Sequence, residues 1–192
     1  MDRIKIEEIN IFLKSISEED LGDYFDELNS LSWESKNKLK FISNAKILLE
    51  EKNYTNNIKL PAKLILQLLI EISYELDLNI LEYWKRLFIN YLYRNDNYEK
   101  ISNVFIKILS QLSMVEINLL GIINETERKA IPKIDCFKKV DIEIFHLENL
   151  RRLELIDDIN NRIMNQNHIN PSSLFYLTSL GKEFISMITK KN

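Results

Sequence analysis

The sequence predicts a mainly α-helical protein, with an N-terminal helical domain over residues 1–112 and a C-terminal winged-helix-like module with a small β-hairpin over residues 113–192. Apolar residues recur at intervals of three and four through the first part, which is typical of packed helices. A capping signal opens the second part, and two strand-like runs precede its last helix. The 192 residues suffice for one compact unit with two parts.

The first helices of the array are indicated by a cap and by apolar spacing. Ser17 is followed by three acids, and such a group satisfies free N–H groups at a helix start, so we expect a helix to Leu31. The next helix carries its apolar residues on one face and ends before a polar loop at residues 53–57. These residues are Leu39, Ile42, Ala45 and Leu49.

Three further helices complete the array. Pro61 marks the start of the first, because its missing N–H would have no partner in a first turn. Each helix carries one apolar stripe, and we expect the aromatic residues to lie in the core and not in a ligand cage. The stripes are Leu64, Leu68, Ile72 and Leu76; Trp84, Leu87, Phe88 and Tyr91; and Ile101, Val104, Phe105, Ile108 and Leu112.

The second part begins at Ser113, which forms with Glu116 the S-x-x-E spacing in which each side chain caps the other's backbone N–H. An extended piece is expected at residues 130–134, because a proline disfavours helical angles in the residue before it. Helical spacing returns from Asp141 to Leu155. The apolar stripes of these two helices are Val115, Leu119 and Ile122, and then Ile144, Leu147 and Leu150.

The last elements are a hairpin and a helix. Two runs, residues 155–159 and 174–177, predict strands joined by a long polar loop. Thr178 then provides the cap for a final helix through Ile188. Helix, short strand, helix, hairpin and helix in this order are typical of a winged-helix module, a helix-turn-helix variant with an added β-hairpin.

Composition restricts the location and the partners. The formal net charge is -3 with both signs interspersed, so no broad positive surface is expected to collect nucleic acid. The first residues alternate charge with isoleucine, unlike a secretory signal, and no apolar stretch is long enough to span a bilayer. We therefore expect a cytoplasmic protein without a membrane segment. The single cysteine, Cys136, excludes an internal disulfide and a multi-thiol metal site.

Few residues offer catalytic chemistry. The two histidines are His146 and His168, and neither lies in a glycine-flanked nucleophile motif. Glu143 and His146 have the E-x-x-H spacing of di-iron helical bundles, but such a site needs a second copy and two more carboxylates. The sequence has no glycine-rich phosphate-binding motif, so we expect neither a cofactor nor a metal.

One spacing suggests an enzyme. Arg162 and His168 form R-x5-H, which resembles the HEPN ribonucleases of bacterial defence systems, where the histidine would serve acid-base chemistry and the arginine would stabilise phosphate. HEPN motifs lie on a helix, whereas these two residues lie in the predicted hairpin loop. They are therefore outside candidates, and the main interpretation assigns no catalytic residue.

Four residues are candidates for contact with a partner: Arg151 and Arg152 on the predicted recognition helix, and Arg162 and His168 in the wing. The same surfaces carry five carboxylates, which repel a phosphate backbone. These are Glu143, Glu148, Glu154, Asp157 and Asp158. Contact with another protein is therefore favoured over contact with nucleic acid.

Three stretches carry a family resemblance: EINLLG from Glu116, then Glu148 to Ile156, then Leu174 to Ile185. Together with upstream matches, they resemble the abortive-infection alpha (Abi-alpha) family from about Leu60 onwards. The upstream matches are Pro61, Glu71, Ser73 and Trp84 to Leu87. One departure is Glu154, where the family pattern usually has glycine at a helix-to-strand turn. A left-handed glutamate there costs about 1 kcal/mol more than glycine, so either the turn differs in this protein or it tolerates the strain.

The resemblance implies a role in bacterial phage defence and transfers no catalytic residue. Combined with the missing catalytic groups, it favours a non-enzymatic antiphage component that binds another protein, either phage-derived or operon-encoded, or senses a phage product. The alternatives are a winged-helix DNA-binding transcriptional regulator and a HEPN-like ribonuclease toxin.

Overall fold

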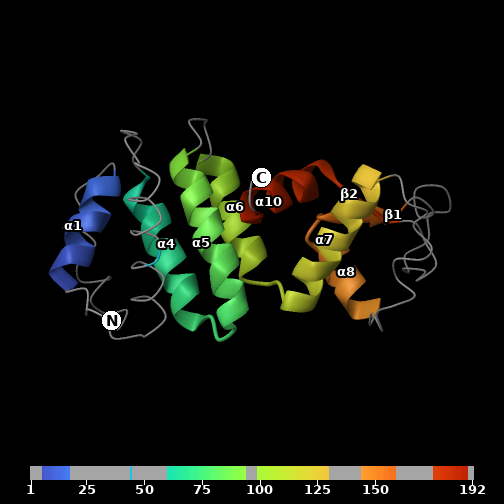
Figure 1. Ribbon diagram of the computed structural model, residues 1–192, viewed down its shortest axis with the longest axis horizontal. Helices are drawn as coiled ribbons and strands as arrows, with labels where there is room; N and C mark the ends of the chain where they lie inside the picture. The colour runs from blue at the N-terminus through green and yellow to red at the C-terminus, as the bar shows by residue number, and fades with distance from the viewer. Residues whose placement is uncertain are drawn as a thin grey trace. The chain divides into compact units, whose positions relative to one another are not determined.

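Residues 6–17, 44, 60–93, 99–129, 144–158 and 175–189 are described by the computed structural model (Figure 1). In this part of the chain, seven helices accompany one sheet of two antiparallel strands, which confirms the predicted mainly α class with a small β-hairpin. The chain divides into two compact units, Met1–Ser110 and Gln111–Asn192. The division predicted from the sequence, after Leu112, lies two residues further along the chain.

The described helices of the first unit are α1 (Ile6–Ile16), α4 (Ala62–Tyr74), α5 (Leu78–Tyr93) and α6 (Glu99–Leu109). Helix α4 contacts both α5 and α6. The N–H of Leu60 donates to the carbonyl of Ile16 at 2.7 Å, and Leu60 forms an isolated parallel bridge with Ser17. Ser17, predicted to cap the next helix, is buried at this bridge. The two helices predicted between Ser17 and Leu49 lie outside the described residues.

The start of α4 is set by Pro61, whose carbonyl accepts hydrogen bonds from the N–H groups of Leu64 at 2.9 Å and Ile65 at 3.2 Å. Pro61 is therefore the N-cap, one residue before the predicted position. Leu64, Leu68 and Ile72 are buried along α4, as predicted. Leu76 was predicted on the same stripe and this is wrong: it is 92% exposed, because the helix has already ended at Tyr74.

Aromatic residues fill the core of the first unit. Trp84, Phe88 and Tyr91 are buried on α5, and Phe105 is buried on α6, so the predicted core role is confirmed. Burial raises the pKa of the Tyr91 hydroxyl. Val104 was predicted to lie on the same stripe of α6 as Phe105, but it is exposed. Leu87 and Ile108 are also buried, as is Leu112 in the second unit.

The second unit contains α7 (Met114–Lys129), α8 (Ile144–Arg152), β1 (Ile156–Asp158), β2 (Phe175–Leu177) and α10 (Ser179–Ile188). The strands pair antiparallel, with Ile156 opposite Leu177 and Asp158 opposite Phe175. Helix α7 contacts β2, α8 and α10. The described elements follow the predicted order, and the predicted extended piece at residues 130–134 lies outside them.

The apolar faces of α7 and α8 cover the core of the second unit. Leu119 on α7 and Leu147 and Leu150 on α8 are buried, as predicted. Val115 was predicted to lie on the same face of α7 but is exposed, because the buried face is rotated toward Glu116 and Leu120. The side chain of Ile144 lies outside the described residues, and Ile122 is half-buried.

The end of α8 explains the departure at position 154. Glu154 has φ 59°, so of the two alternatives for this turn the structure has the strained left-handed residue and not a different turn. Its N–H donates to the carbonyl of Arg151 at 2.9 Å, and the N–H of Leu155 donates to the carbonyl of Leu150 at 3.0 Å. This pair of bonds is the Schellman motif, which usually has glycine at the left-handed position, and the buried Leu150 and Leu155 supply its apolar contact.

Replacing this residue with glycine is expected to stabilise the protein. Glu154→Gly removes the clash between Cβ and the backbone in the left-handed region, and we expect a gain of about 1 kcal/mol in the free energy of unfolding. Urea denaturation of the variant and the wild type measures the difference. A variant that is less stable than the wild type would show that the Glu154 side chain makes a contact outweighing the strain.

Within the described residues, no single helix combines the length and the apolar composition that crossing a membrane requires.

Candidate functional site

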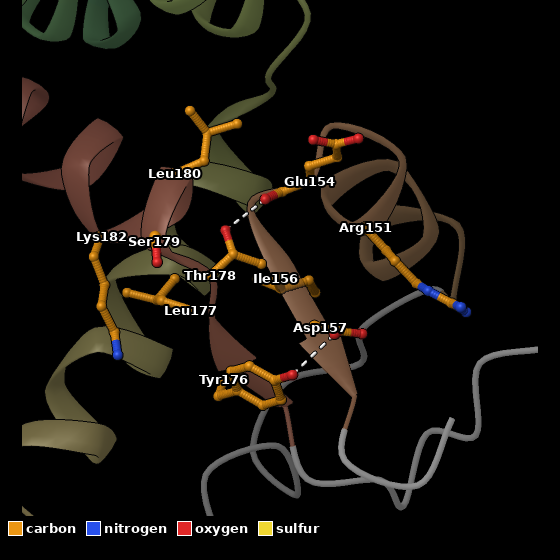
Figure 2. Close-up of a pocket in the computed structure, with 10 residues that line it drawn as sticks. All are labelled: Arg151, Glu154, Ile156, Asp157, Tyr176, Leu177, Thr178, Ser179, Leu180 and Lys182. Carbon is orange, nitrogen blue, oxygen red and sulfur yellow. Dashed lines mark hydrogen bonds between the residues drawn. The ribbon is translucent and has the colours of Figure 1, made fainter. Parts of the chain in front are cut away.

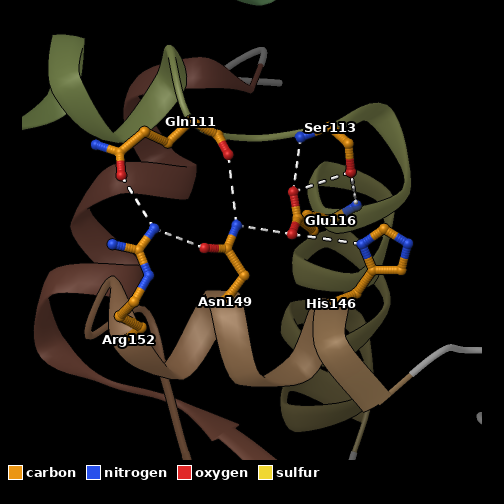
Figure 3. Close-up of polar contacts among 6 residues, drawn as sticks. All are labelled: Gln111, Ser113, Glu116, His146, Asn149 and Arg152. Atoms are coloured by element: carbon orange, nitrogen blue, oxygen red, sulfur yellow. Dashed lines mark hydrogen bonds and ion pairs between the residues drawn. The ribbon is translucent and has the colours of Figure 1, made fainter.

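The start of α7 carries the predicted capping box. The Ser113 N–H donates to Glu116 Oε2 at 2.7 Å, and the Glu116 N–H donates to Ser113 Oγ at 3.4 Å (Figure 3). The Ser113 hydroxyl also donates to Glu116 Oε2 at 2.9 Å. Both halves of the reciprocal cap are therefore present, and they fix the first turn of α7.

The same carboxylate joins α7 to α8. Asn149 Nδ2 donates to Glu116 Oε1 at 2.8 Å and lies 3.4 Å from the backbone carbonyl of Gln111. Arg152 donates to Asn149 Oδ1 at 2.8 Å and to Gln111 Oε1 at 3.1 Å. This polar cluster, made of Gln111, Ser113, Glu116, His146, Asn149 and Arg152, connects residues up to 41 positions apart (Figure 3).

His146 completes the polar cluster from α8. Its Nδ1 lies 3.4 Å from Glu116 Oε1 without the alignment of a hydrogen bond, so the contact is electrostatic. The Phe145 ring lies against His146, with ring centroids 3.9 Å apart. His146 therefore sits between a buried carboxylate and an exposed aromatic ring.

Glu116 is the electrostatic centre of the polar cluster. Burial, which leaves Glu116 only 3% exposed, acts to raise the pKa of its carboxyl. The hydrogen bonds from Ser113 and Asn149 and the contact with His146 act in the opposite direction and prevail, so the pKa of Glu116 is lowered. The carboxylate is therefore charged near neutral pH and held by several donors.

This arrangement differs from a catalytic triad in the order of its groups. In acyl transfer, the histidine contacts the nucleophile and the carboxylate orients the histidine from the far side. Here the carboxylate lies between Ser113 and His146, and the Ser113 hydroxyl donates to it. Among the described residues no imidazole lies against this hydroxyl, and its contacts are those of a structural cap.

The outward face of α8 is the surface that a recognition helix would present. Phe145 is 53% exposed on it, and Glu148 and Arg152 follow at intervals of three and four. Arg152, predicted as a partner contact, is exposed but also bonded within the polar cluster. The face thus offers an aromatic ring, an acid and a cation whose position is fixed.

Arg151, the other predicted contact on α8, borders an open hollow of about 680 Å³ beside the hairpin. Figure 2 shows Arg151 and Lys182 on opposite sides of the hairpin. Tyr176 donates to Asp157 Oδ2 at 2.8 Å, and Thr178 donates to the carbonyl of Glu154 at 2.5 Å. The polar groups of this hollow bond to one another across the strands and do not converge on one point, as ligand-binding groups do.

The remaining candidates cannot be placed beside these groups. Arg162 and His168 lie outside the described residues, as do Glu143 and Cys136. Among the residues that are described, no three histidine, cysteine or acidic side chains gather as a metal site would require. The ribonuclease hypothesis for Arg162 and His168 therefore stays a prediction.

Two features of this region were missed by sequence reasoning. The exposed aromatic, Phe145, was passed over because its neighbours Ile144 and Leu147 suggested a purely apolar, buried stripe. The second missed residue is Asn149, a polar residue in the interior of a helix. A side-chain amide at such a position often bonds to a residue distant in the sequence, and this signal could have indicated its contact with Glu116.

Comparisons with protein-family models, with curated proteins and with solved structures gave no match. The resemblance to the Abi-alpha family stays a prediction.

Proposed function

We propose that this protein is a non-enzymatic component of a bacterial antiphage system, acting in the cytoplasm by binding another protein through the outward face of α8. The observation that carries this proposal is the composition of that face, with Phe145 exposed and Glu148 and Arg152 beside it. The resemblance of the sequence from about Leu60 onwards to the Abi-alpha family supports the defence role.

The charges of α8 favour a protein partner over nucleic acid. Residues 144–154 hold two acids, Glu148 and Glu154, and two arginines, Arg151 and Arg152, so their formal charges cancel. Binding to a duplex depends on local positive charge that neutralises phosphates. Exposed aromatic residues and arginines are instead enriched among the residues that dominate protein–protein binding energies.

Phage plating tests both parts of the proposal. We expect the wild-type gene to lower plating efficiency relative to a deletion, and Phe145→Ser to weaken that protection about tenfold or more, because an exposed aromatic residue can contribute much of the binding energy. Val115→Ser is the matched control, since Val115 is an exposed apolar residue on α7, and it should keep full protection.

Two outcomes count against the proposal. Unchanged plating when the gene is deleted would remove the defence role. Full protection by Phe145→Ser, with thermal unfolding showing that it folds, would remove α8 as the binding face.

The order of elements in the second unit supports one other function, a DNA-binding regulator, because α8 and the hairpin occupy the places of a recognition helix and wing. A gel-shift assay at low salt against the neighbouring promoter region decides between the two. A sequence-specific shift that disappears in Arg151→Glu/Arg152→Glu would favour the regulator, and no shift would leave the protein-binding role.

A further inference from the structure

The turn between α4 and α5 exposes three large apolar side chains. Tyr74 is 75% exposed, Leu76 is 92% exposed and Leu78 is 57% exposed, at alternating positions of one short segment. Single exposed leucines are ordinary on protein surfaces, but contiguous exposed apolar groups mark interaction sites. We call Tyr74, Leu76 and Leu78 the apolar turn.

Hydrogen bonds hold the apolar turn in one conformation. Glu75 Oε1 accepts from the Asp77 N–H at 2.8 Å, and Glu75 Oε2 accepts from the indole N–H of Trp84 at 3.4 Å. Asp77 Oδ1 accepts from the Asn79 N–H at 2.8 Å, which caps the start of α5. Because the acids fix the backbone from inside, the leucines are presented outward with little conformational freedom left to lose on binding.

The charges that flank the apolar turn in the sequence are of one sign. Between Lys63 and Lys85 the sequence contains four acids and no lysine or arginine. Glu75 and Asp77 alternate with the exposed apolar residues, and Glu71 lies one helical turn before Tyr74. Glu82, the fourth acid, pairs with Lys85 at 2.9 Å and so contributes less to the local field. Acidic residues therefore flank the apolar turn closely in the sequence.

We propose that the apolar turn is a docking surface for a partner protein whose apolar pocket is bordered by lysine or arginine. Electrostatic complementarity between the acids and such a border would select this partner and speed its association. This surface lies in the first unit, and the inference depends on neither α8 nor the antiphage role.

The same charges argue against the other occupants of an exposed apolar turn. Nucleic acid and anionic lipid headgroups would meet Glu71, Glu75 and Asp77 with like charge. In a two-fold symmetric dimer the same patch lies on both sides of the interface, so the acids of one copy would meet a patch that carries the same acids. A cationic protein surface relieves this repulsion in a way that none of these occupants does.

Site-directed crosslinking tests the proposal in the full-length chain. A photo-crosslinking amino acid is placed at position 76 in cells that express the protein, and the crosslinked product is identified and purified as a separate protein. Its affinity is then measured for the wild type, for Leu76→Ser/Leu78→Ser, and for the control Ile11→Ser/Val104→Ser, which removes two exposed apolar residues elsewhere in the same unit.

We expect the product to be one protein with a basic apolar surface, bound about tenfold or more weakly by Leu76→Ser/Leu78→Ser and within about twofold of the wild type by the control. Raising the salt concentration should weaken binding of the wild type. Unchanged Trp84 fluorescence in a Trp33→Phe background shows that the variants keep the fold around the turn.

Any other result overturns the proposal. Such results are a crosslink to nucleic acid, to lipid, to a second copy or within the same chain, the absence of any crosslink, and equal affinity for the two double variants. The affinity variants change Leu76 and Leu78 and leave Phe145 in place, whereas the plating assay changes Phe145 and leaves the apolar turn in place. The failure of one proposal can therefore be distinguished from the failure of the other.

Discussion

Gly181→Ala is expected to lower the free energy of unfolding by roughly 3 kcal/mol, because a Cβ at position 181 would overlap the backbone carbonyl oxygen of Leu155. A backbone atom cannot move aside as a flexible side chain can. The first turn of α10 would have to shift, which would pull Thr178 from the carbonyl of Leu155, where its N–H donates at 3.1 Å. Denaturant unfolding followed by circular dichroism measures the loss.

Gly121 provides the matched control for this substitution. It lies in α7, and a Cβ there would meet nothing within 4 Å. Because alanine favours helix more than glycine does, Gly121→Ala should raise stability by about 1 kcal/mol. The two glycine-to-alanine substitutions are thus expected to change stability in opposite directions. Equal effects of the same sign would contradict the close approach of α10 to Leu155.

Glu116→Gln is the second substitution expected to have a large effect, a loss of about 2 kcal/mol near neutral pH. The amide keeps the shape of the carboxyl, but it replaces an acceptor by a donor opposite Ser113 or Asn149. One of these buried groups then loses its partner. Glu148→Gln on the exposed face of α8 is the control and should change stability little.

The effect of Glu116→Gln should depend on pH in one direction. The pKa of Glu116 is lowered in the folded protein from its ordinary value of 4.5, so the carboxylate contributes its full stability above that value. The contribution is lost as the pH falls through the lower, folded-state pKa. The difference in unfolding free energy between wild type and variant should therefore shrink as the pH falls below 4.5. A difference that grows below pH 4.5 would refute the assigned contacts.

Features governed by neighbouring residues could be predicted from the sequence. The Ser113–Glu116 cap and the Thr178 cap of α10 are confirmed, because each depends on side chains within a few positions of the backbone they serve. The hairpin is confirmed as well, because strand-forming runs and a polar loop mark it in the sequence. At Glu154 the sequence left two alternatives open, and φ 59° selects the strained left-handed turn.

Features governed by distant residues could not be predicted in the same way. Periodicity gives the spacing of an apolar stripe but neither its end nor the side on which a partner helix lies, so Leu76, Val104 and Val115 were wrongly assigned to buried faces. Arg152 was predicted only as a contact with a partner. The structure also bonds it to Gln111, which lies 41 positions earlier in the sequence, so no local pattern could indicate this bond. Only the folded chain brings these groups together.

The carbonyls of Glu154 and Leu155 have a consequence for how the second unit opens. Thr178 Oγ1 donates to both carbonyls, while the Leu155 N–H closes the end of α8, so two successive peptide units connect the end of α8 to the start of α10. Fraying of the first turn of α10 would remove the Thr178 bonds that hold these peptide units. Amide protons of Leu155 and Lys182 should therefore exchange with solvent at similar rates.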